Sequence, residues 1–581
     1  MTGKKLIPLV LLLQLGFILS ACYSTKLEPA QPTSVQPATA QPTIVQQVTA
    51  QPTPIQAVKV QPVTGLPQGT DGYAWWNDTV FYEIFVRSFY DSNADGIGDF
   101  NGIIEKLDYL NDGNPSTTND LGVTGIWLMP INPSPSYHGY DPTDYYGVNS
   151  DYGTMDDFKK LMEECHKRGI RVIIDMVYNH SSNQNPWFIE ARDKPQSSKH
   201  DWYVWSESNP GYAGPWGEQV WYQTVAGYFY AIFASTQPDL NYANNSVTDE
   251  MHNVARFWLQ DIGVDGFRLD AARYLVEDGE NQQDTVETHA WWKKFYTFYK
   301  GINPQAMTVG EIYTTNFIVD DYVKNDEFDQ AFNFDLASQI LKNVDRQNAV
   351  NLNAGIKSSF ELFPKGDYAT FLSNHDQERV MSFYSGDQGK AKSAATVLLT
   401  TPGTPFIYYG EEIGMTGTKP DEEIRTPMLW SDEKYAGFST VYPWEPINTN
   451  YQEINVATES TDPNSLLTQY RTLIGVRNEH AALRVGDYVG VKSDNPSLLS
   501  FLRVSKEETL LVIINLSTEA TSGYNLSLNQ GPLSGSYHLV PVLDDRTLPD
   551  INANANGGFD SYQPNLEIPA NGFVIIQLRG S

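Results

Sequence analysis

Cysteine is nearly absent from this chain of 581 residues, in which only Cys22 and Cys165 occur. Two cysteines cannot form the disulfide framework of a small secreted scaffold. Basic residues are also scarce, since 39 Lys and Arg stand against 70 Asp and Glu, which gives a net charge of −31. This acidity argues against a nucleic acid as partner. The length exceeds what one hydrophobic core supports, so several domains are expected.

A targeting segment is predicted at the N-terminus, where Lys4 and Lys5 precede the apolar run Leu6 to Leu19. The run is short for a membrane-spanning helix and typical of a signal peptide. It ends in Leu-Ser-Ala-Cys22, which resembles the bacterial lipobox, in which the cysteine is lipidated. An ordinary cleaved signal with an incidental cysteine is the alternative. We therefore expect a lipoprotein signal peptide at 1–22, lipidation of Cys22, and a location in the cell envelope, lipid-anchored to a membrane and exposed outside the cytoplasm.

A linker rich in Pro, Gln and Thr is predicted at 23–72. The sequence Ala-Gln-Pro-Thr occurs at 30–33, 40–43 and 50–53. Such a composition cannot bury a core, and its prolines favour an extended chain. We expect this linker to hold the folded part of the protein away from the membrane surface.

From Tyr73 onward, apolar runs typical of strands alternate with amphipathic helices. We expect strands at Val80–Arg87, Val123–Met129, Arg171–Val177, Val264–Asp270, Met307–Glu311, Phe328–Phe334, Tyr368–Ser373 and Pro405–Tyr409. Eight such runs with helices between most of them predict an α/β fold, a parallel (β/α)8 or TIM barrel. We assign its two parts to residues 73–182 and 241–484.

Two further domains are predicted. The stretch between His180 and Gln237 holds five tryptophans and is too apolar for a loop, so 183–240 is assigned to an inserted domain B after the third strand. Residues 485–581 show short alternating strands punctuated by turn signals such as Asn554 to Gly558. This pattern predicts a C-terminal all-β sandwich. The helical run Met155 to Arg168 contains Cys165, which we expect to be buried.

Three carboxylates end three different predicted strands. Arg268 and Asp270 lie two residues apart on one strand and share a face, while Glu311 and Asp376 end two others. An arginine beside a carboxylate can be a purely structural ion pair. Strand ends of a barrel are, however, where barrel enzymes keep their chemistry. Glycoside cleavage needs one ionised carboxylate and one carboxylic acid, and we expect Arg268 to keep Asp270 ionised and a less polar setting to raise the pKa of Glu311.

Four short motifs resemble the signature regions of the α-amylase family, glycoside hydrolase family 13. They are Asp175-Met-Val-Tyr-Asn179-His180, Gly266-Phe-Arg-Leu-Asp270, Val309-Gly-Glu311-Ile and Asn374-His375-Asp376, in that order along the chain. The resemblance implies Asp270 as nucleophile, Glu311 as acid/base, Asp376 as the third carboxylate, and retention through a covalent glycosyl-enzyme. It also implies sugar contacts from His138, Tyr140, His180, Arg268 and His375.

A calcium site is predicted after the first strand. Asp91, Asn93, Asp95 and Asp99 place side-chain oxygens at spaced positions, and Ile97 would add its carbonyl oxygen. The loop starts like an EF-hand, but a glycine stands where the closing glutamate should be. It resembles the calcium loop of several family members, and a polar turn without metal is the alternative. The resemblance also suggests Asn179 and Asp239 as ligands of a second Ca2+, which some relatives lack.

The specificity signals of the sequence are mixed. The segment Gln237–Asn241 resembles oligo-1,6-glucosidases and α-glucosidases, whereas Ala271 resembles α-1,4-acting amylases. Arg273 and Tyr274 replace residues common in α-amylases and leave the leaving-group subsites open. We expect an endo-acting α-amylase that cleaves α-1,4 bonds of starch, glycogen and maltooligosaccharides, and that is a monomer. The alternatives are an α-glucosidase, oligo-1,6-glucosidase or 4-α-glucanotransferase, or, in a different class, a non-catalytic glucan-binding surface protein.

Overall fold

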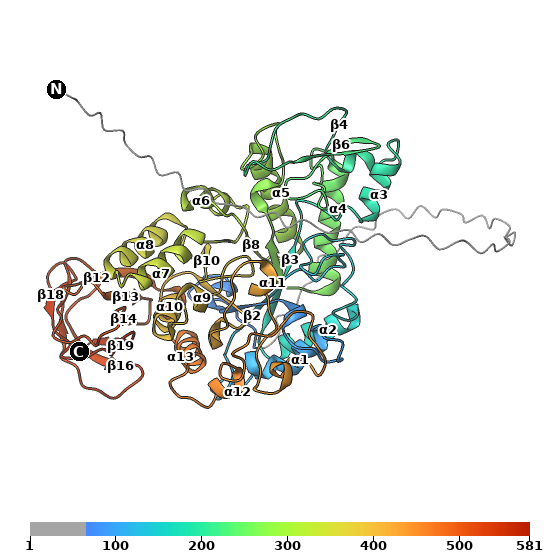
Figure 1. Cartoon of the computed structure of the whole chain (residues 1–581). Helices are drawn as coiled ribbons and strands as arrows, with labels where there is room; N and C mark the ends of the chain where they lie inside the picture. The colour runs from blue at the N-terminus through green and yellow to red at the C-terminus, as the bar shows by residue number, and fades with distance from the viewer. Residues whose placement is uncertain (1–64, 581) are drawn as a thin grey trace, which may run out of the picture. The chain divides into compact units, whose positions relative to one another are not determined.

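A closed barrel of eight parallel strands forms the centre of the protein, whose computed structural model describes residues 65–580 (Figure 1). The predicted signal peptide, Cys22 and most of the predicted linker lie outside the described residues. The strands follow each other around the barrel in the order β1, β11, β10, β9, β8, β7, β3, β2. Their bounds are β1 Phe81–Ile84, β2 Gly125–Leu128, β3 Arg171–Met176, β7 Gly266–Leu269, β8 Met307–Gly310, β9 Gln330–Phe332, β10 Tyr368–Thr370 and β11 Thr404–Tyr408.

The predicted barrel is therefore confirmed, and each of the eight expected strands is present. Most are shorter than expected at their carboxyl ends. β1 stops at Ile84 because Val86–Ser88 turns into a 3-10 helix, and β10 stops three residues before Ser373. The polar residues that follow these strands therefore lie on loops at the barrel mouth. The barrel closes where β1 pairs with β11, with Phe81 opposite Phe406.

Alternation along the strands separates the packed interior from the barrel mouth. On β1, Phe81 points inward and stacks on Phe406 at 4.4 Å, and Glu83, two residues later, shares its face. Ile173 and Asp175 on β3 are spaced in the same way. Apolar side chains thus fill the lower interior, and polar side chains of the same parity lie one layer higher. At the crowded β7–β8 contact only glycine fits, because a Cβ on Gly266 would lie 2.1 Å from a backbone oxygen.

Helices cover the barrel and connect its strands. They are α1 Phe100–Leu110, α2 Met155–Lys167, α4 Asn245–Arg256, α5 Val286–Ile302, α6 Asn316–Val323, α7 Phe334–Asp345, α8 Ala349–Leu362, α9 Val380–Phe383, α10 Gln388–Thr400, α11 Asp421–Ile424, α12 Val456–Glu459, α13 Leu466–Glu479 and α14 Ala481–Val485. Helix α2 begins with a capping box between Thr154 and Asp157, and its Cys165 is buried as expected. No helix within 65–580 is long and apolar enough to cross a membrane.

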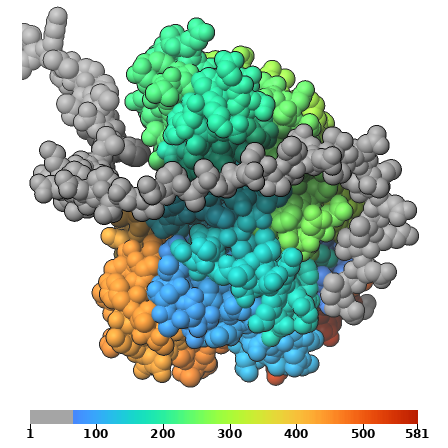
Figure 2. Space-filling view, turned by 90° about the vertical axis from the view of Figure 1, so that its right-hand side faces the viewer, coloured from blue at the N-terminus to red at the C-terminus, as the bar shows by residue number. Residues whose placement is uncertain are grey.

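The segment between β3 and α4 forms a small substructure with a sheet of its own. Its strands β4 (Trp205–Ser206), β6 (Gly227–Tyr230) and β5 (Trp221–Thr224) pair in this order, next to helix α3 (Pro186–Asp193). In the space-filling view it forms the teal-green lobe above α1 and α2 (Figure 2). Phe188 packs against Tyr203 and Phe229 at about 5 Å. The aromatic residues of this segment therefore build a core, as its composition suggested.

The C-terminal part is all β. Strands β12 (Asp487–Ser493), β13 (Leu498–Val504), β14 (Thr509–Asn515), β15 (Leu526–Leu528), β16 (Ser536–Pro541), β17 (Ile551–Asn552), β18 (Phe559–Tyr562) and β19 (Phe573–Gly580) form one sheet in the order 17-16-19-14-13-12-15-18. β12 pairs with β13 through its first half and with β15 through its second. Side chains from both ends of the sheet share one buried cluster, so the sheet folds over on itself.

Candidate active site

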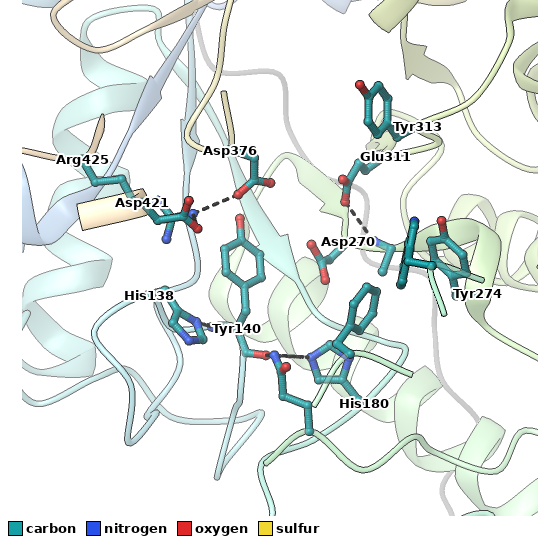
Figure 3. Close-up of a pocket in the computed structure, with 14 residues that line it drawn as sticks. His138, Tyr140, His180, Asp270, Tyr274, Glu311, Tyr313, Asp376, Asp421 and Arg425 are labelled. Carbon is teal, nitrogen blue, oxygen red and sulfur yellow. Dashed lines mark hydrogen bonds and ion pairs between the residues drawn. The ribbon is translucent and has the colours of Figure 1, made fainter. Parts of the chain in front are cut away.

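A pocket of about 350 Å3 opens at the carboxyl ends of the barrel strands (Figure 3). It lies between the barrel and the segment inserted after β3. Its walls are His138, Tyr140, His180, Trp216, Phe233, Gln237, Asp270, Ala271, Tyr274, Glu311, Tyr313, Asp376, Asp421 and Arg425. The structure thus brings the three predicted carboxylates and three of the five predicted sugar contacts to one cavity. Arg268 and His375 lie directly beneath it.

Arg268 is the buried centre of this site. Its Nη1 donates to Asp270 Oδ1 at 2.6 Å and to Asp175 at 2.9 and 3.1 Å. Its Nη2 donates to Glu311 Oε2 at 2.8 Å. One guanidinium therefore holds three carboxylates, two of which line the pocket, and fixes their relative positions.

The pKa values of Asp270 and Glu311 are both raised. Burial raises the pKa of Asp270 to about 6, although the Arg268 guanidinium opposes this effect. Burial likewise raises the pKa of Glu311 to about 7, with Arg268 lowering it and Asp270 and Asp376 raising it. The expectation that Glu311 would lie in a less polar setting agrees with this shift. The pKa of Asp270 still lies below neutral pH, so Asp270 stays largely ionised at pH 7, although desolvation outweighs the shared guanidinium of Arg268.

The two acids present different oxygens to the pocket. Glu311 Oε2 accepts from Arg268 and from the backbone N–H of Ala271 at 3.0 Å, while Oε1 accepts no hydrogen bond from residues 65–580. A proton on Glu311 therefore belongs on Oε1. Asp270 uses Oδ1 for Arg268, which leaves Oδ2 free within the described residues. Ala271 can approach Glu311 because its backbone adopts a left-handed conformation with φ +49°.

Asp376, in contrast to Glu311, is held in its ionised form. Its Oδ1 accepts from Arg425 Nη2 at 2.9 Å and its Oδ2 lies 3.1 Å from His375 Nε2. Burial alone would raise the pKa of Asp376, but His375 and Arg425 more than offset it and hold the pKa well below its usual value. Its side chain is 44% exposed. Asp376 is thus an ionised acceptor that faces the pocket.

Tyr140 and the two histidines beside it form the floor and one wall. The Tyr140 ring stacks on His375 at 5.4 Å, and its hydroxyl donates to Asp175 Oδ2 at 2.9 Å. His180 Nε2 donates to the carbonyl oxygen of Tyr140 at 2.8 Å, and burial lowers the pKa of His180 to about 4. His138 Nδ1 accepts from the N–H of Tyr140 at 3.0 Å. Tyr140 therefore offers a flat face whose position is fixed from three sides.

Aromatic side chains line the pocket on the side of Glu311. Trp216, 60% exposed, stacks on Phe233 at 5.8 Å and packs against Tyr274 at 5.3 Å. Tyr313, 67% exposed, packs on Phe334 at 4.6 Å. Trp216 comes from the inserted segment and Tyr313 from the loop after β8. Two exposed rings, Trp216 and Tyr313, thus line the pocket.

Arg273 does not line the pocket, although the sequence placed it near the leaving-group subsites. It pairs with Asp284 in a short ion pair, and its Nη1 donates to the carbonyl oxygen of Tyr313 at 2.9 Å. Arg273 therefore acts on the pocket by positioning the backbone of Tyr313. Tyr274, its neighbour, does line the pocket.

Several residues of the site were not singled out by the sequence. Asp175 begins the first motif but was given no role, and Glu83 was not named; each lies two residues after an inward apolar residue on its strand, which is a signal that could have been used. Arg425 and Asp421 come from the region of α11, and Trp216 comes from a turn of the inserted segment. No local pattern places these three at the pocket, since their positions depend on long connections.

The predicted calcium loop is compact and rich in oxygen atoms. Asp91 is buried and accepts from the N–H groups of Asn93, Ala94 and Gly96, and from the Ser439 hydroxyl. Asp99 accepts from Ser92 and caps α1 through the N–H of Gly102. Asn93 and Asp95 are exposed, and Ile97 follows them in the same turn. The oxygen-only donor set fits the chemistry of Ca2+, while residues 65–580 hold no group of three or more His, Cys, Asp or Glu suited to a metal.

The other suggested pair of ligands is in direct contact. Asn179 Nδ2 donates to Asp239 Oδ2 at 3.2 Å and to the carbonyl oxygen of Tyr274 at 2.7 Å. Asp239 Oδ1 accepts from the N–H of Ile232. Burial raises the pKa of Asp239, and the nearby Glu277 adds to this effect. These hydrogen bonds join the residues after β3 directly to the inserted segment and to the loop after β7, so that no metal ion is needed to bridge them.

Comparisons with known proteins agree with this geometry. The sequence model of the α-amylase catalytic domain matches residues 83–486. α-Amylase 3 of Dictyoglomus thermophilum is 39% identical over 461 residues, covering 78% of this chain and 88% of that protein. An oligo-1,6-glucosidase of Parageobacillus thermoglucosidasius is 36% identical over 520 residues, covering 76% and 90%. The crystal structure of an α-amylase from H. orenii superimposes with a TM-score of 0.76 at 38% identity and covers 86% of this chain and 99% of its own. With its barrel, its all-β C-terminal part and these matches, the chain belongs to the α-amylase family of glycoside hydrolases, glycoside hydrolase family 13.

Proposed function

We propose that this protein is a retaining, endo-acting α-amylase that cleaves α-1,4-glucosidic bonds of starch, glycogen and maltooligosaccharides. The observation that carries the proposal is the arrangement of Asp270, Glu311 and Asp376 around one pocket, with Arg268 between the first two. Retaining glycosidases need their two working carboxyl groups close together, about 5–5.5 Å apart. A single guanidinium that contacts both acids keeps them at such short range.

Each carboxyl group has a distinct role in the proposed reaction. Asp270 attacks the anomeric carbon through Oδ2, while Glu311 donates its proton from Oε1 to the glycosidic oxygen. The bond between sugar and leaving group breaks as the bond to Asp270 forms. Glu311 then takes a proton from water, which attacks the same carbon and releases Asp270. Asp376, ionised at neutral pH, accepts hydrogen bonds from sugar hydroxyls at the cleavage point.

The direction of the substrate follows from the two sides of the pocket. Glu311 protonates the leaving group, so the leaving sugar lies toward Trp216, Tyr274 and Tyr313. The sugar that reacts with Asp270 lies over Tyr140, between Asp376 and His138. Sugar rings present flat apolar faces that suit exposed aromatic rings.

The choice between an amylase and a glucosidase is supported by two observations. Ala271, next to the nucleophile, lines the pocket, as in the α-1,4-acting sequence pattern. The relatives with α-amylase names reach 38–39% identity. The oligo-1,6-glucosidase relative at 36% and the Gln237–Asn241 segment favour the second candidate, an α-glucosidase or a transferase that uses the same intermediate.

A product time course on soluble starch and maltooligosaccharides tests the proposal. Early mixed oligosaccharides with a fast fall in iodine colour are expected of an endo-acting amylase. Glucose from the start, with persistent iodine colour, would assign the protein to the α-glucosidases, and products longer than the supplied sugar would reveal a transferase. If calcium-supplemented protein gave no product at all, the enzymatic role would be wrong and a glucan-binding role would remain.

Replacing Trp216 with Ala should raise KM for maltotetraose about 2- to 10-fold, because one stacked aromatic contact is worth roughly 0.5–1.5 kcal/mol. The kcat should change less, since the acids are untouched. The matched control is Phe317→Ala, which removes an equally exposed ring, 69% accessible, from α6 outside the pocket lining. Equal KM values for the Trp216 variant and the parent would contradict a role in binding the leaving sugar.

We propose that Asp91, Asn93, Asp95, Asp99 and the carbonyl of Ile97 hold a Ca2+ ion. Calcium bound there would tie the loop after β1 to Ser439, because Asp91 contacts both. Its role would be structural, since the loop does not line the pocket. A second Ca2+ held by Asn179 and Asp239 would replace the hydrogen bond that now joins Asn179 Nδ2 to Asp239 Oδ2.

Removing calcium with a chelator should lower the melting temperature. A ligand at 100 times its Kd stabilises the folded state by about 2.7 kcal/mol. Asp95→Ala should abolish the calcium dependence, because Asp95 is exposed and contributes little else. The control is Asp112→Ala, which changes a partly exposed aspartate in another loop. A melting temperature that calcium does not shift in the parent protein would exclude this site.

We propose that the protein is lipid-anchored through Cys22 and acts on α-glucan outside the cytoplasm. The support is the sequence pattern at the N-terminus, which lies outside the described residues. Cys22→Ser should move the protein from the membrane fraction to the soluble fraction, measured by fractionation and immunoblotting. Equal partition of both proteins would contradict the anchor.

A further inference from the structure

Glu83 is a buried carboxylate at the pocket that the proposed reaction does not use. It lies on the inward face of β1, is 1% exposed, and does not line the cavity. Its Oε1 lies 2.6 Å from Nδ1 of His375. A buried carboxylate is costly unless it is paired, so this contact calls for a partner that carries a proton.

His375 meets oxygen atoms at both ring nitrogens. Nε2 lies 2.7 Å from the Tyr140 hydroxyl and 3.1 Å from Asp376 Oδ2. The Tyr140 hydroxyl already donates its hydrogen to Asp175, so it can only accept from His375. Nε2 must therefore carry a hydrogen, and Nδ1 faces the carboxylate of Glu83. An imidazole with acceptors on both sides satisfies them only as the doubly protonated cation.

Both negatively and positively charged groups surround His375. Asp376 and Glu83 contact the ring directly, and Asp175 lies behind the Tyr140 hydroxyl. Arg425 donates to the carbonyl oxygen of His375 and to Asp376, and Arg268 lies beyond Asp175. Burial alone would lower the pKa of His375, but Asp376 and Glu83 outweigh it and raise the pKa to about 9. Glu83 is the one of these two carboxylates that never faces the sugar.

We propose that Glu83 is a positioning residue that keeps the His375 imidazole doubly protonated, so that His375 donates to both Asp376 and the Tyr140 hydroxyl. In this state Asp376 stays ionised and the Tyr140 ring keeps its orientation beneath the sugar. The role of this pair in sugar binding rests on the proposed function. The protonation state of His375 does not, and the two can be tested separately.

The first test is an NMR titration of the histidine side chains. The chain has nine histidines, and the His375 signal is identified by its loss in His375→Gln. We expect His375 to titrate above pH 8 in the parent protein and to fall by 1–3 pH units in Glu83→Gln, the effect of removing one adjacent opposite charge. The matched control is Glu412→Gln, a fully buried glutamate that hydrogen-bonds to Tyr82 and Tyr109 instead. A His375 titration that is the same in Glu83→Gln and the parent would overturn the proposal.

The second test measures maltotetraose binding in a Glu311→Gln background, in which Glu311 no longer titrates and the sugar is not cleaved. Asp270, whose pKa is about 6, still titrates in this background, so binding is compared as the ratio of the Kd values with and without Glu83→Gln at each pH from 5.5 to 8. The added Glu83→Gln change should weaken binding only at pH values above the new His375 pKa. Weakening by the same factor at every pH would make Glu83 a purely structural residue and overturn the proposal.

A variant that fails to fold can be distinguished from one that has lost the proposed role of Glu83. Glu83→Asp serves as a second variant, because it keeps the charge and should keep the high His375 pKa if Glu83→Gln does not fold. A low His375 pKa in the folded Asp variant would also count against the proposal. If the Glu311→Gln protein bound no maltooligosaccharide, the proposed substrate would be wrong, while the NMR result would still decide the role of Glu83.

Discussion

Asp270→Asn should lower kcat for maltooligosaccharide hydrolysis by about 10^4-fold or more, as is found when a residue that acts within a catalytic unit is removed. The amide keeps the size of the side chain and can still accept from Arg268 through its oxygen. It cannot attack the anomeric carbon. The measurement is a single-turnover and steady-state comparison of the purified variant with the parent protein.

Asp421→Asn is the matched control, because Asp421 also lines the pocket but only pairs with Arg425 and Lys419. Its activity should stay within about 10-fold of the parent, as for a partly exposed ion pair. A further variant, Asp270→Gly, leaves room for azide. With an activated aryl α-glucoside, azide should restore turnover and give a β-glucosyl azide, because one displacement inverts the carbon that two displacements retain. An α-configured azide product, or equal losses in both asparagine variants, would contradict Asp270 as nucleophile.

Arg268→Met should destabilise the fold by about 3–5 kcal/mol at pH 7.5, because it leaves buried carboxylates without their cation. Burial already raises the pKa values of Asp175, Asp270 and Glu311 in the parent, and without Arg268 these groups would bind protons still more tightly in the folded than in the unfolded protein. Stability therefore increases as pH falls, so the deficit should shrink at pH 5. Urea denaturation of variant and parent at both pH values measures it.

The control for this variant is Arg168→Met, which removes an arginine whose partners, Asp108 and Glu164, are at the surface. Exposed pairs contribute about 0–1 kcal/mol, and this loss should be similar at the two pH values. A deficit of Arg268→Met that did not change between pH 7.5 and pH 5 would show that lost packing, not unpaired charge, is responsible.

Much of the barrel could be predicted from the sequence, because the alternation of side chains between the two faces of a strand is a local property. Runs such as Arg171–Val177 are mostly apolar and buried along their length, and residues two apart on a strand share a face. Asp270 and Glu311 were found because each ends an apolar run, with Arg268 on the same face as Asp270 and the family motifs in support. The ends of the strands were less accurate, since Val86–Ser88 forms a 3-10 helix within a stretch expected to be a strand.

The rest of the site depends on contacts that no short pattern encodes. Trp216 reaches the pocket through a turn in which its N–H donates to Glu218. Arg425 contacts Asp376 although 49 residues separate them in the sequence. The pKa of Asp270 also depends on such contacts. Sequence shows that Arg268 is adjacent, but not that it is shared among three acids or how deeply all of them are buried.

The pairing of the first barrel strand with the last has a consequence for how the protein is made. Phe81 cannot meet Phe406 until the chain up to β11 has left the ribosome. Glu83, on the first strand, likewise waits for His375. No shorter nascent chain can hold the complete pocket, so catalytic competence arises only when the barrel closes.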